Sequence, residues 1–285
     1  MAERTIFIEN RCKISYSNDY LKVDKDGEIS TFHIDEFDVV VFSSLEISCS
    51  LYLLSKLSER DKVVIFCDNR KLPQCSLFPL AGAYNSNLRL REQMSWNKEV
   101  KNLIWTKIVS TKLQSQADAL KFCGIDALSI PLIEYGDLNN AEGHFANEYF
   151  NKMFGRHFLR HDNDNINSAL NYGYSVLLSV TARIIASHGY NQALGIHHAS
   201  MTNNFNLSCD IMEPFRPIID VIVKRHGDSP LDTSYKCALA HSIYENVRYN
   251  GQKCSVRLAI DLFFRDTIKS LNDNENKIGE FSIVA

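Results

Sequence analysis

The first 80 residues alternate between apolar and polar positions in short runs that have the period of β-strands. Asp26-Gly27 separates two of these runs and predicts a hairpin turn. A helical pattern covers 48–57, and a continuously apolar run over 63–67 predicts a buried strand. We therefore expect an N-terminal β-sandwich-like domain with one helix over residues 1–75. Its other strands are predicted at residues 4–9, 13–16, 20–23, 28–34 and 39–42.

After this domain the hydrophobic spacing changes to the period of helices. Pro73, Pro79 and Gly82 interrupt the chain, and we expect a linker over residues 76–88. The remaining residues, 89–285, are predicted to form a larger all-α domain, so the fold class is α+β with two domains. Helical periodicity is clearest over 88–120, which fits one or two amphipathic helices, and over 232–272.

One long helix has recognisable ends. Asp164 or Asn165 can cap its first turn, and Gly189 can stop it just after Ser187.

Composition excludes several classes of protein. Hydrophobic residues make up 45% of the 285 residues and charged residues 23%, which is typical of a globular chain. No apolar run is long enough to cross a membrane, and the first ten residues lack the apolar core of a secretory signal, so we expect a cytoplasmic protein. None of the eight cysteines falls in a C-x-x-C pair, which argues against a zinc knuckle or redox motif. The net charge of −3 excludes a uniformly basic surface, though not a local basic track.

Two carboxylates lie close together in the sequence Asp210-Ile-Met-Glu213-Pro-Phe-Arg216-Pro. On a helix, residues three apart share a face, and paired carboxylates attract a divalent cation. Pro214 places Glu213 at a kink or at a helix start, where its carboxylate is aimed rigidly. The alternative is a solvated pair at a helix boundary.

Glu142 and the pair His197-His198 are further candidate ligands. If the two histidines are helical, they point about 100° apart and cannot both enter one site. Each of these residues alone is compatible with a structural or solvated role. Together with the carboxylates they form a site only if they converge in space. A site with carboxylate oxygens and one imidazole as ligands favours Mg²⁺ or Mn²⁺.

Basic side chains recur over residues 89–112, with Trp96 and Trp105 between them. This stretch either follows a phosphate backbone or forms a solvated helix face. The sequence lacks the glycine-rich motifs of ATPases and dinucleotide enzymes and the G-x-S-x-G elbow of serine hydrolases. The basic residues of the stretch are Arg89, Arg91, Lys98, Lys101, Lys107 and Lys112.

Taken together, these segments resemble a known family, CRISPR-associated protein one, the spacer-acquisition integrase and endonuclease of CRISPR adaptation. The resemblance is specific from about residue 88 to 225, and the segment Val64 to Pro73 is most similar to the type II branch. It is carried by Trp105-x-x-Ile108-x-x-x-Lys112, Glu142-Gly-x-x-Ala146-x-x-Tyr149-Phe150, Asn165-x-Asn167-x-x-Leu170-Asn171-Tyr172-Gly173-Tyr174, His198-Ala199 and Asp210-Ile-Met-Glu213-Pro-Phe-Arg216-Pro.

The resemblance implies roles for particular residues. The family's catalytic metal ligands fall on Glu142, His198 and Glu213, and a nearby acid that assists the site falls on Asp210. His197 matches no required position. The arginine that is common after Ala146 in the family is replaced by Asn147, which removes one phosphate contact.

Three arginines are candidates for phosphate binding. Arg216 is either a phosphate clamp or a salt bridge that fixes the kinked segment. Arg89 and Arg91 belong to the basic stretch. Tyr149 and Tyr172 are expected to be core or site-wall residues rather than nucleophiles.

The implied reaction is a Mg²⁺- or Mn²⁺-dependent transesterification that joins the 3′-hydroxyl ends of captured double-stranded DNA to the CRISPR repeat. The implied partners are a second copy of this chain and CRISPR-associated protein two in a heterohexamer-type complex. In type II systems the effector nuclease and a ring-shaped DNA-end protein are added. Two alternatives stay open: a stand-alone metal-dependent nuclease that cuts branched DNA, and a non-catalytic DNA-binding scaffold.

Overall fold

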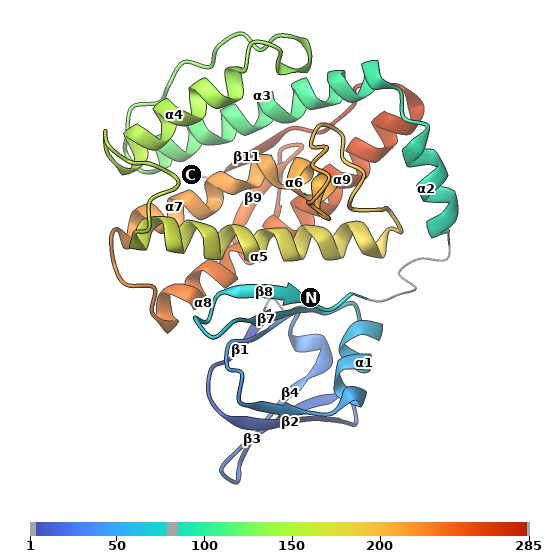
Figure 1. Cartoon of the computed structure of the whole chain (residues 1–285), viewed down its shortest axis with the longest axis vertical. Helices are drawn as coiled ribbons and strands as arrows, with labels where there is room; N and C mark the ends of the chain where they lie inside the picture. The colour runs from blue at the N-terminus through green and yellow to red at the C-terminus, as the bar shows by residue number, and fades with distance from the viewer. Residues whose placement is uncertain (1–3, 79–84, 284–285) are drawn as a thin grey trace. The chain divides into compact units, whose positions relative to one another are not determined.

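The computed structural model describes residues 4–78 and 85–283. The chain divides into two compact units, residues 1–82 and 83–285, which are drawn in Figure 1. The middle of the predicted linker, with Pro79 and Gly82, lies outside the described residues.

The N-terminal unit consists of two four-stranded sheets that share one apolar core. In the first sheet, with strand order β1-β5-β7-β8, β1, β5 and β7 run parallel and β8 is antiparallel to β7. The second sheet has the order β4-β3-β2-β6. The strands are β1 (Thr5–Ile8), β2 (Cys12–Ser17), β3 (Tyr20–Lys25), β4 (Glu28–His33), β5 (Val39–Phe42), β6 (Ile47–Cys49), β7 (Val63–Cys67) and β8 (Pro73–Ser76).

The core of this unit explains why the period-2 pattern was informative. Ile8, Ile14 and Leu21 come from different strands of the two sheets and are all buried in one cluster, together with Leu53 from α1 (Leu51–Glu59). The six predicted strands and the helix are confirmed, whereas β6 and β8 were missed because each has only three or four residues and is largely exposed. Asp26 and Gly27 have φ of 54° and 90°, as the predicted hairpin turn requires.

The C-terminal unit is mainly helical. The segment 88–120 forms two helices, and the long helix predicted to end at Ser187 is α5, whose first turn is capped by Asp164 Oδ1 accepting from the Asn167 N–H at 2.6 Å. The helices are α2 (Ser86–Met94), α3 (Lys98–Phe122), α4 (Ala141–Phe154), α5 (Asn165–Ser187), α6 (Asn206–Met212), α7 (Arg216–His226), α8 (Thr233–His241) and α9 (Val256–Asp273). Single 3₁₀ turns are η1 (Ile34–Glu36) in the first unit, and η2 (Tyr135–Asp137), η3 (Glu213–Phe215) and η4 (Ser242–Tyr244) in this one.

The prediction of an all-α domain is wrong, because the C-terminal unit also contains a three-stranded antiparallel sheet. Its strands, in the order β10-β9-β11, are β10 (Gln252–Ser255), β9 (Asn246–Tyr249) and β11 (Phe281–Ile283). Asn250 and Gly251 have φ of 50° and 75°, which is the geometry of a two-residue hairpin turn. This Asn-Gly signal was present in the sequence, within a segment that was assigned to helices from 232 to 272.

Helix α3 is the element around which the helical unit is arranged. It contacts α4, η3 and α7, while α5 packs against α6 and α7 (Figure 1). The three segments that carry the candidate residues therefore meet beside α3. No helix within residues 4–78 and 85–283 combines the length and the hydropathy needed to cross a membrane.

The contact between α5 and α7 depends on Gly173. A Cβ at this position would lie 2.4 Å from Ile219 Cγ2 and 3.2 Å from Leu239 Cδ2. We expect Gly173→Ala to lower the free energy of unfolding by about 1–3 kcal/mol, because overpacking outweighs the gain in helix propensity. Urea unfolding measures this. Ser175→Ala, on the same helix but partly exposed, should change it little, and a neutral or stabilising Gly173→Ala would contradict this account of the packing.

Candidate metal and DNA site

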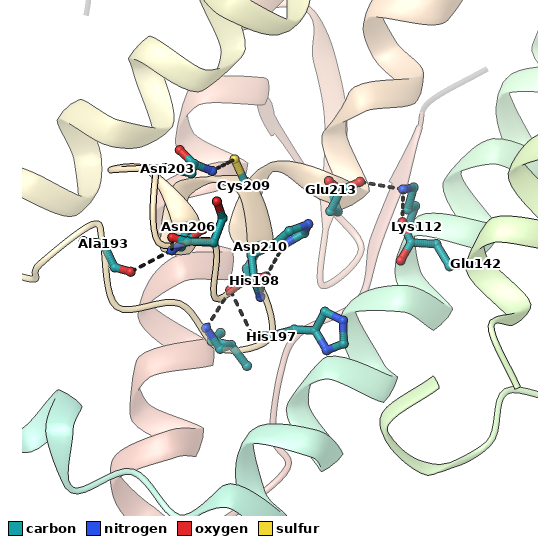
Figure 2. Close-up of polar contacts among 12 residues, drawn as sticks. Lys112, Glu142, Ala193, His197, His198, Asn203, Asn206, Cys209, Asp210 and Glu213 are labelled. Atoms are coloured by element: carbon teal, nitrogen blue, oxygen red, sulfur yellow. Dashed lines mark hydrogen bonds and ion pairs between the residues drawn. The ribbon is translucent and has the colours of Figure 1, made fainter. Parts of the chain in front are cut away.

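Two carboxylates from different helical segments converge on one ammonium group. Lys112, on α3, places its Nζ 2.5 Å from Glu142 Oε1 and 2.5 Å from Glu213 Oε2 (Figure 2). Glu142 lies in the first turn of α4, and Glu213 begins η3. The structure thus brings together two predicted site residues that are 71 positions apart, through a lysine that the sequence analysis had placed in the basic stretch.

Two members of this cluster, Lys112 and Glu213, are buried, and Glu142 is partly exposed. Lys112 is 8% exposed and Glu213 is 4% exposed. Burial disfavours the charged form of Lys112, but the attraction of Glu213 and Glu142 outweighs it and raises the pKa of the lysine. Burial likewise opposes ionisation of Glu213, and Lys112 and Arg216 overcome it and lower the pKa of that carboxyl. Lys112 and Glu213 are therefore held in their charged forms.

Glu213 is aimed by the joint between α6 and α7. It ends α6 with helical dihedrals, φ −51° and ψ −47°, although Pro214 follows it. The predicted position at a kink or helix start is confirmed. Arg216 Nε lies 3.0 Å from Glu213 Oε1, and its guanidinium stacks 4.8 Å from the centre of the Tyr174 ring. Of the two roles considered for Arg216, the structure shows the salt bridge at the kinked segment.

His198 is fixed by Asp210. The Asp210 carboxylate is fully buried and lies 2.6 Å from His198 Nδ1. It also accepts backbone N–H groups of Ile196 at 2.6 Å and of His197 and His198 at 3.1 Å each. With Nδ1 engaged by the carboxylate, Nε2 is the ring nitrogen of His198 that can bind a ligand. The hydrogen bond to Asp210 raises the pKa of His198 against the effect of its partial burial.

The two histidines lie in the irregular segment between α5 and α6, so the assumption that they are helical was wrong. The His197 ring stacks on Trp105 at 4.3 Å with an interplanar angle of 4°, and Figure 2 shows it apart from Lys112 and the two glutamates. Gly195 permits this loop conformation because a Cβ there would meet the carbonyl oxygen of His198 at 2.2 Å and Asp210 Oδ2 at 2.8 Å. A buried aspartate and a close-approach glycine thus direct one histidine toward the glutamates and the other onto α3.

Among the residues that the structure describes, no three His, Cys, Asp or Glu side chains form a ready-made metal cage. Glu142 and Glu213 are nevertheless held around a cation, the Lys112 ammonium, and His198 is electrostatically coupled to both. Oxygen ligands with one imidazole suit Mg²⁺ or Mn²⁺. The donor set fits such an ion.

The basic stretch does not form a continuous phosphate track. Lys112 is buried, Arg89 pairs with Glu92 at 2.9 Å, and Arg91 is exposed on α2. A cavity of about 410 Å³ adjoins this segment; its lining includes Trp96, Lys101, Gly195, His198 and Met201. The sequence analysis did not identify this cavity, since it depends on how α2, α3 and the loop after α5 pack.

A second buried polar cluster supports the site from α7. Asp220 accepts hydrogen bonds from the hydroxyls of Tyr149 at 2.8 Å and Tyr174 at 2.5 Å. Burial raises the pKa of Asp220 to about 6, against the lowering effect of the two hydroxyls. Tyr149 and Tyr172 are buried as predicted. The link from Asp220 through Tyr174 to Arg216 was missed, because no spacing in the sequence marks it.

Comparison with known proteins decides the family. Residues 6–226 match the profile of the family described as CRISPR associated protein Cas1. A relative from Neisseria meningitidis serogroup C, named CRISPR-associated endonuclease Cas1, is 33% identical over 272 residues, covering 92% of this chain and 90% of its own length. The chain belongs to the Cas1 family. The resemblance seen in the sequence is confirmed.

Solved structures share the fold of this Cas1 family member. A casposase bound to integration product superposes with a TM-score of 0.77 at 18% identity, covering 96% of this chain and 92% of that one. A Cas6-RT-Cas1–Cas2 complex contains a chain that superposes with a TM-score of 0.61 at 17% identity, covering 95% of this chain and 35% of that one. At these identities the likeness concerns the fold.

The contact between Asp210 and His198 predicts a change in titration. In Asp210→Asn, the pKa of His198 should fall toward its ordinary value, because the hydrogen bond that raises it loses its charge. An NMR titration of the ring measures this. Asp228→Asn, an exposed substitution, should leave the pKa of His198 unchanged. An unaltered His198 titration in Asp210→Asn would show that the contact does not control this ring.

The raised pKa of Asp220 predicts a pH-dependent stability. The folded chain binds this proton more tightly than the unfolded chain, so the contribution of Asp220 is present at low pH and lost as the pH rises through about 6. Asn cannot ionise. The difference in the free energy of unfolding, Asp220→Asn minus the unsubstituted protein, should therefore be about 2 kcal/mol more positive at pH 7.5 than at pH 4.5.

Urea unfolding at both pH values tests this difference. Asp162→Asn, at an exposed position, is the control and should show no such pH-dependent gain. A parallel response of Asp220→Asn and the unsubstituted protein would show that Asp220 has an ordinary pKa.

Proposed function

We propose that this chain is a metal-dependent DNA endonuclease and integrase that acts in CRISPR spacer acquisition. The observation that carries the proposal is the convergence of a buried glutamate, Glu213, and a partly exposed one, Glu142, on a single cationic centre beside His198. Membership of the Cas1 family and the name of the relative from Neisseria meningitidis support it. A scaffold without catalytic function has no need to hold two carboxylates together at a site where one of them is buried, since their repulsion destabilises the fold.

Glu142, Glu213 and His198 Nε2 would hold Mg²⁺ or Mn²⁺. When bound, such an ion stabilises negative charge on the scissile phosphate and on the leaving oxygen. Which of the two metals binds depends on its availability in the cell as well as on the ligands.

Other residues of the chain orient the proposed metal ligands. Asp210 keeps the imidazole of His198 in one tautomer and one direction. Arg216 holds Glu213 from the side opposite the lysine contact, on the other carboxylate oxygen. The Arg216 guanidinium already contacts Glu213 and the Tyr174 ring. To bind a DNA phosphate directly, it would have to contact the phosphate and the Glu213 carboxylate at the same time.

In this reaction the protein has to align the reacting groups and does not need to form a covalent bond to the DNA. The attacking 3′-hydroxyl and the phosphorus must be held in line, and this positioning supplies a large part of the rate enhancement. The substrates we propose are the captured double-stranded fragment and the CRISPR repeat. The neighbouring casposase bound to integration product supports a strand-joining reaction on this fold.

The partners in the proposed function are a second copy of the chain and CRISPR-associated protein two. The Cas6-RT-Cas1–Cas2 complex among the structural neighbours supports the second of these. The effector nuclease and the ring-shaped DNA-end protein follow from the type II resemblance alone. Cytoplasmic action is part of the same proposal, because the CRISPR array lies in the bacterial chromosome.

A second candidate function uses the same site with water as the nucleophile. The relative from Neisseria meningitidis is named an endonuclease, which favours DNA cutting as an activity in its own right. The two reactions differ in their product, a joined strand in one case and a cut strand in the other. The experiment therefore has to record both.

A strand-joining assay tests the proposal. The purified chain and its small partner are mixed with a labelled duplex and a supercoiled plasmid carrying the repeat, with Mn²⁺ or with EDTA. We expect label joined to the plasmid with Mn²⁺ only. Glu142→Gln and Glu213→Gln should each lower joining by at least about 100-fold, because each removes one charged ligand of the ion. His198→Ala should fail likewise.

Glu148→Gln is the matched control, since Glu148 lies exposed on the same helix as Glu142 and should leave joining intact. Nicking without joined label would favour the nuclease. Full joining by Glu213→Gln would remove Glu213 from the ligands. Joining in EDTA would contradict metal dependence.

A further inference from the structure

The Lys112 ammonium occupies the place where the proposed metal ligands meet. Its Nζ lies 2.5 Å from a carboxylate oxygen of Glu142 and 2.5 Å from one of Glu213. Its side chain is 10% exposed, so the contact is an internal ion pair rather than a solvated one. Figure 2 shows the lysine between the two glutamates, with one dashed contact to each.

An internal lysine in this position has two effects that act in opposite directions. In the absence of a divalent cation it neutralises the repulsion between the two carboxylates and keeps them together. A cation that bound both glutamates would need the space beside the same oxygens, and its charge would repel the ammonium. Lys112 and the ion therefore compete for one position.

We infer that Lys112 is a built-in counter-ion that a divalent cation displaces, so that metal binding releases the lysine toward the bound DNA. The inference rests on the proposed function, because it concerns the same ligands. Once released, the ammonium is an additional cation beside the scissile phosphate, where a charged donor is favourable. Lys112 thereby keeps the glutamates in place before the ion arrives and becomes a phosphate contact afterwards.

The first test is metal affinity. Lys112→Gln removes the competing charge and its ion pairs with both carboxylates, so its Kd for Mn²⁺, measured by calorimetry without DNA, should be about tenfold lower than that of the unsubstituted chain. Lys121→Gln is the control: Lys121 lies on the same helix, is well exposed, and is paired with Asp118 at 3.9 Å. Its Kd should not change.

The second test uses the unsubstituted chain and does not depend on the folding of a variant. Acetylation of Lys112 by a water-soluble acylating reagent, followed by mass spectrometry, should be slow without metal because the amine is buried and ion-paired. Saturating Mg²⁺ should accelerate it several-fold. Lys121 provides the internal reference, and its rate of acetylation should not respond to Mg²⁺.

The outcomes separate the inference from the function on which it rests. Tighter Mn²⁺ binding by Lys112→Gln, together with slower strand joining, would support the displacement of Lys112. Unchanged or weaker binding by a folded Lys112→Gln, or acetylation that ignores Mg²⁺, would overturn it while leaving the metal centre in place. If neither protein binds Mn²⁺, the proposed function itself fails, and this inference fails with it.

Discussion

The central constraint in this structure is the close approach of two carboxylates, one buried and one partly exposed, to the same lysine. Glu142 and Glu213 come from separate helical segments and would repel each other in a medium of low polarity. Lys112 offsets that repulsion from α3, and Arg216 contributes a second positive charge on the far oxygen of Glu213. Removing one member of such a network leaves another charge unpaired, which costs about 3–5 kcal/mol. The arrangement of α3, α4 and the α6–α7 joint is therefore tied to the charges they carry.

The sequence was most informative where local rules decide the structure. Alternating strands, the Asp26-Gly27 turn and the Asp164 cap were predicted because each depends on residues within a few positions. Glu142, His198 and Glu213 were already candidates from their residue types, but their assignment as one ligand set came from family resemblance, because convergence of side chains that are far apart in the chain leaves no local pattern. Asn250-Gly251 shows the opposite error, since a clear local signal was overlooked within a segment that had been assigned to helices.

The features that sequence did not provide all depend on tertiary packing. Lys112 looked like one member of a basic stretch, and only the position of α4 and η3 makes it an internal counter-ion. The hydroxyls around Asp220 belong to α4 and α5, and their common partner lies on α7. The segment with the two histidines is irregular because its backbone N–H groups donate hydrogen bonds to the buried carboxylate of Asp210. The hydrophobic periodicity of the sequence does not reveal such contacts.

Helix α3 carries both Trp105, which stacks on His197, and Lys112, which contacts the glutamates. The two residues are seven positions apart, which corresponds to about two helical turns, so both side chains project from the same face. Inserting or deleting one residue between them would turn one of the pair by about 100° away from its partner. The interval from Trp105 to Lys112 therefore acts as a spacer of fixed length.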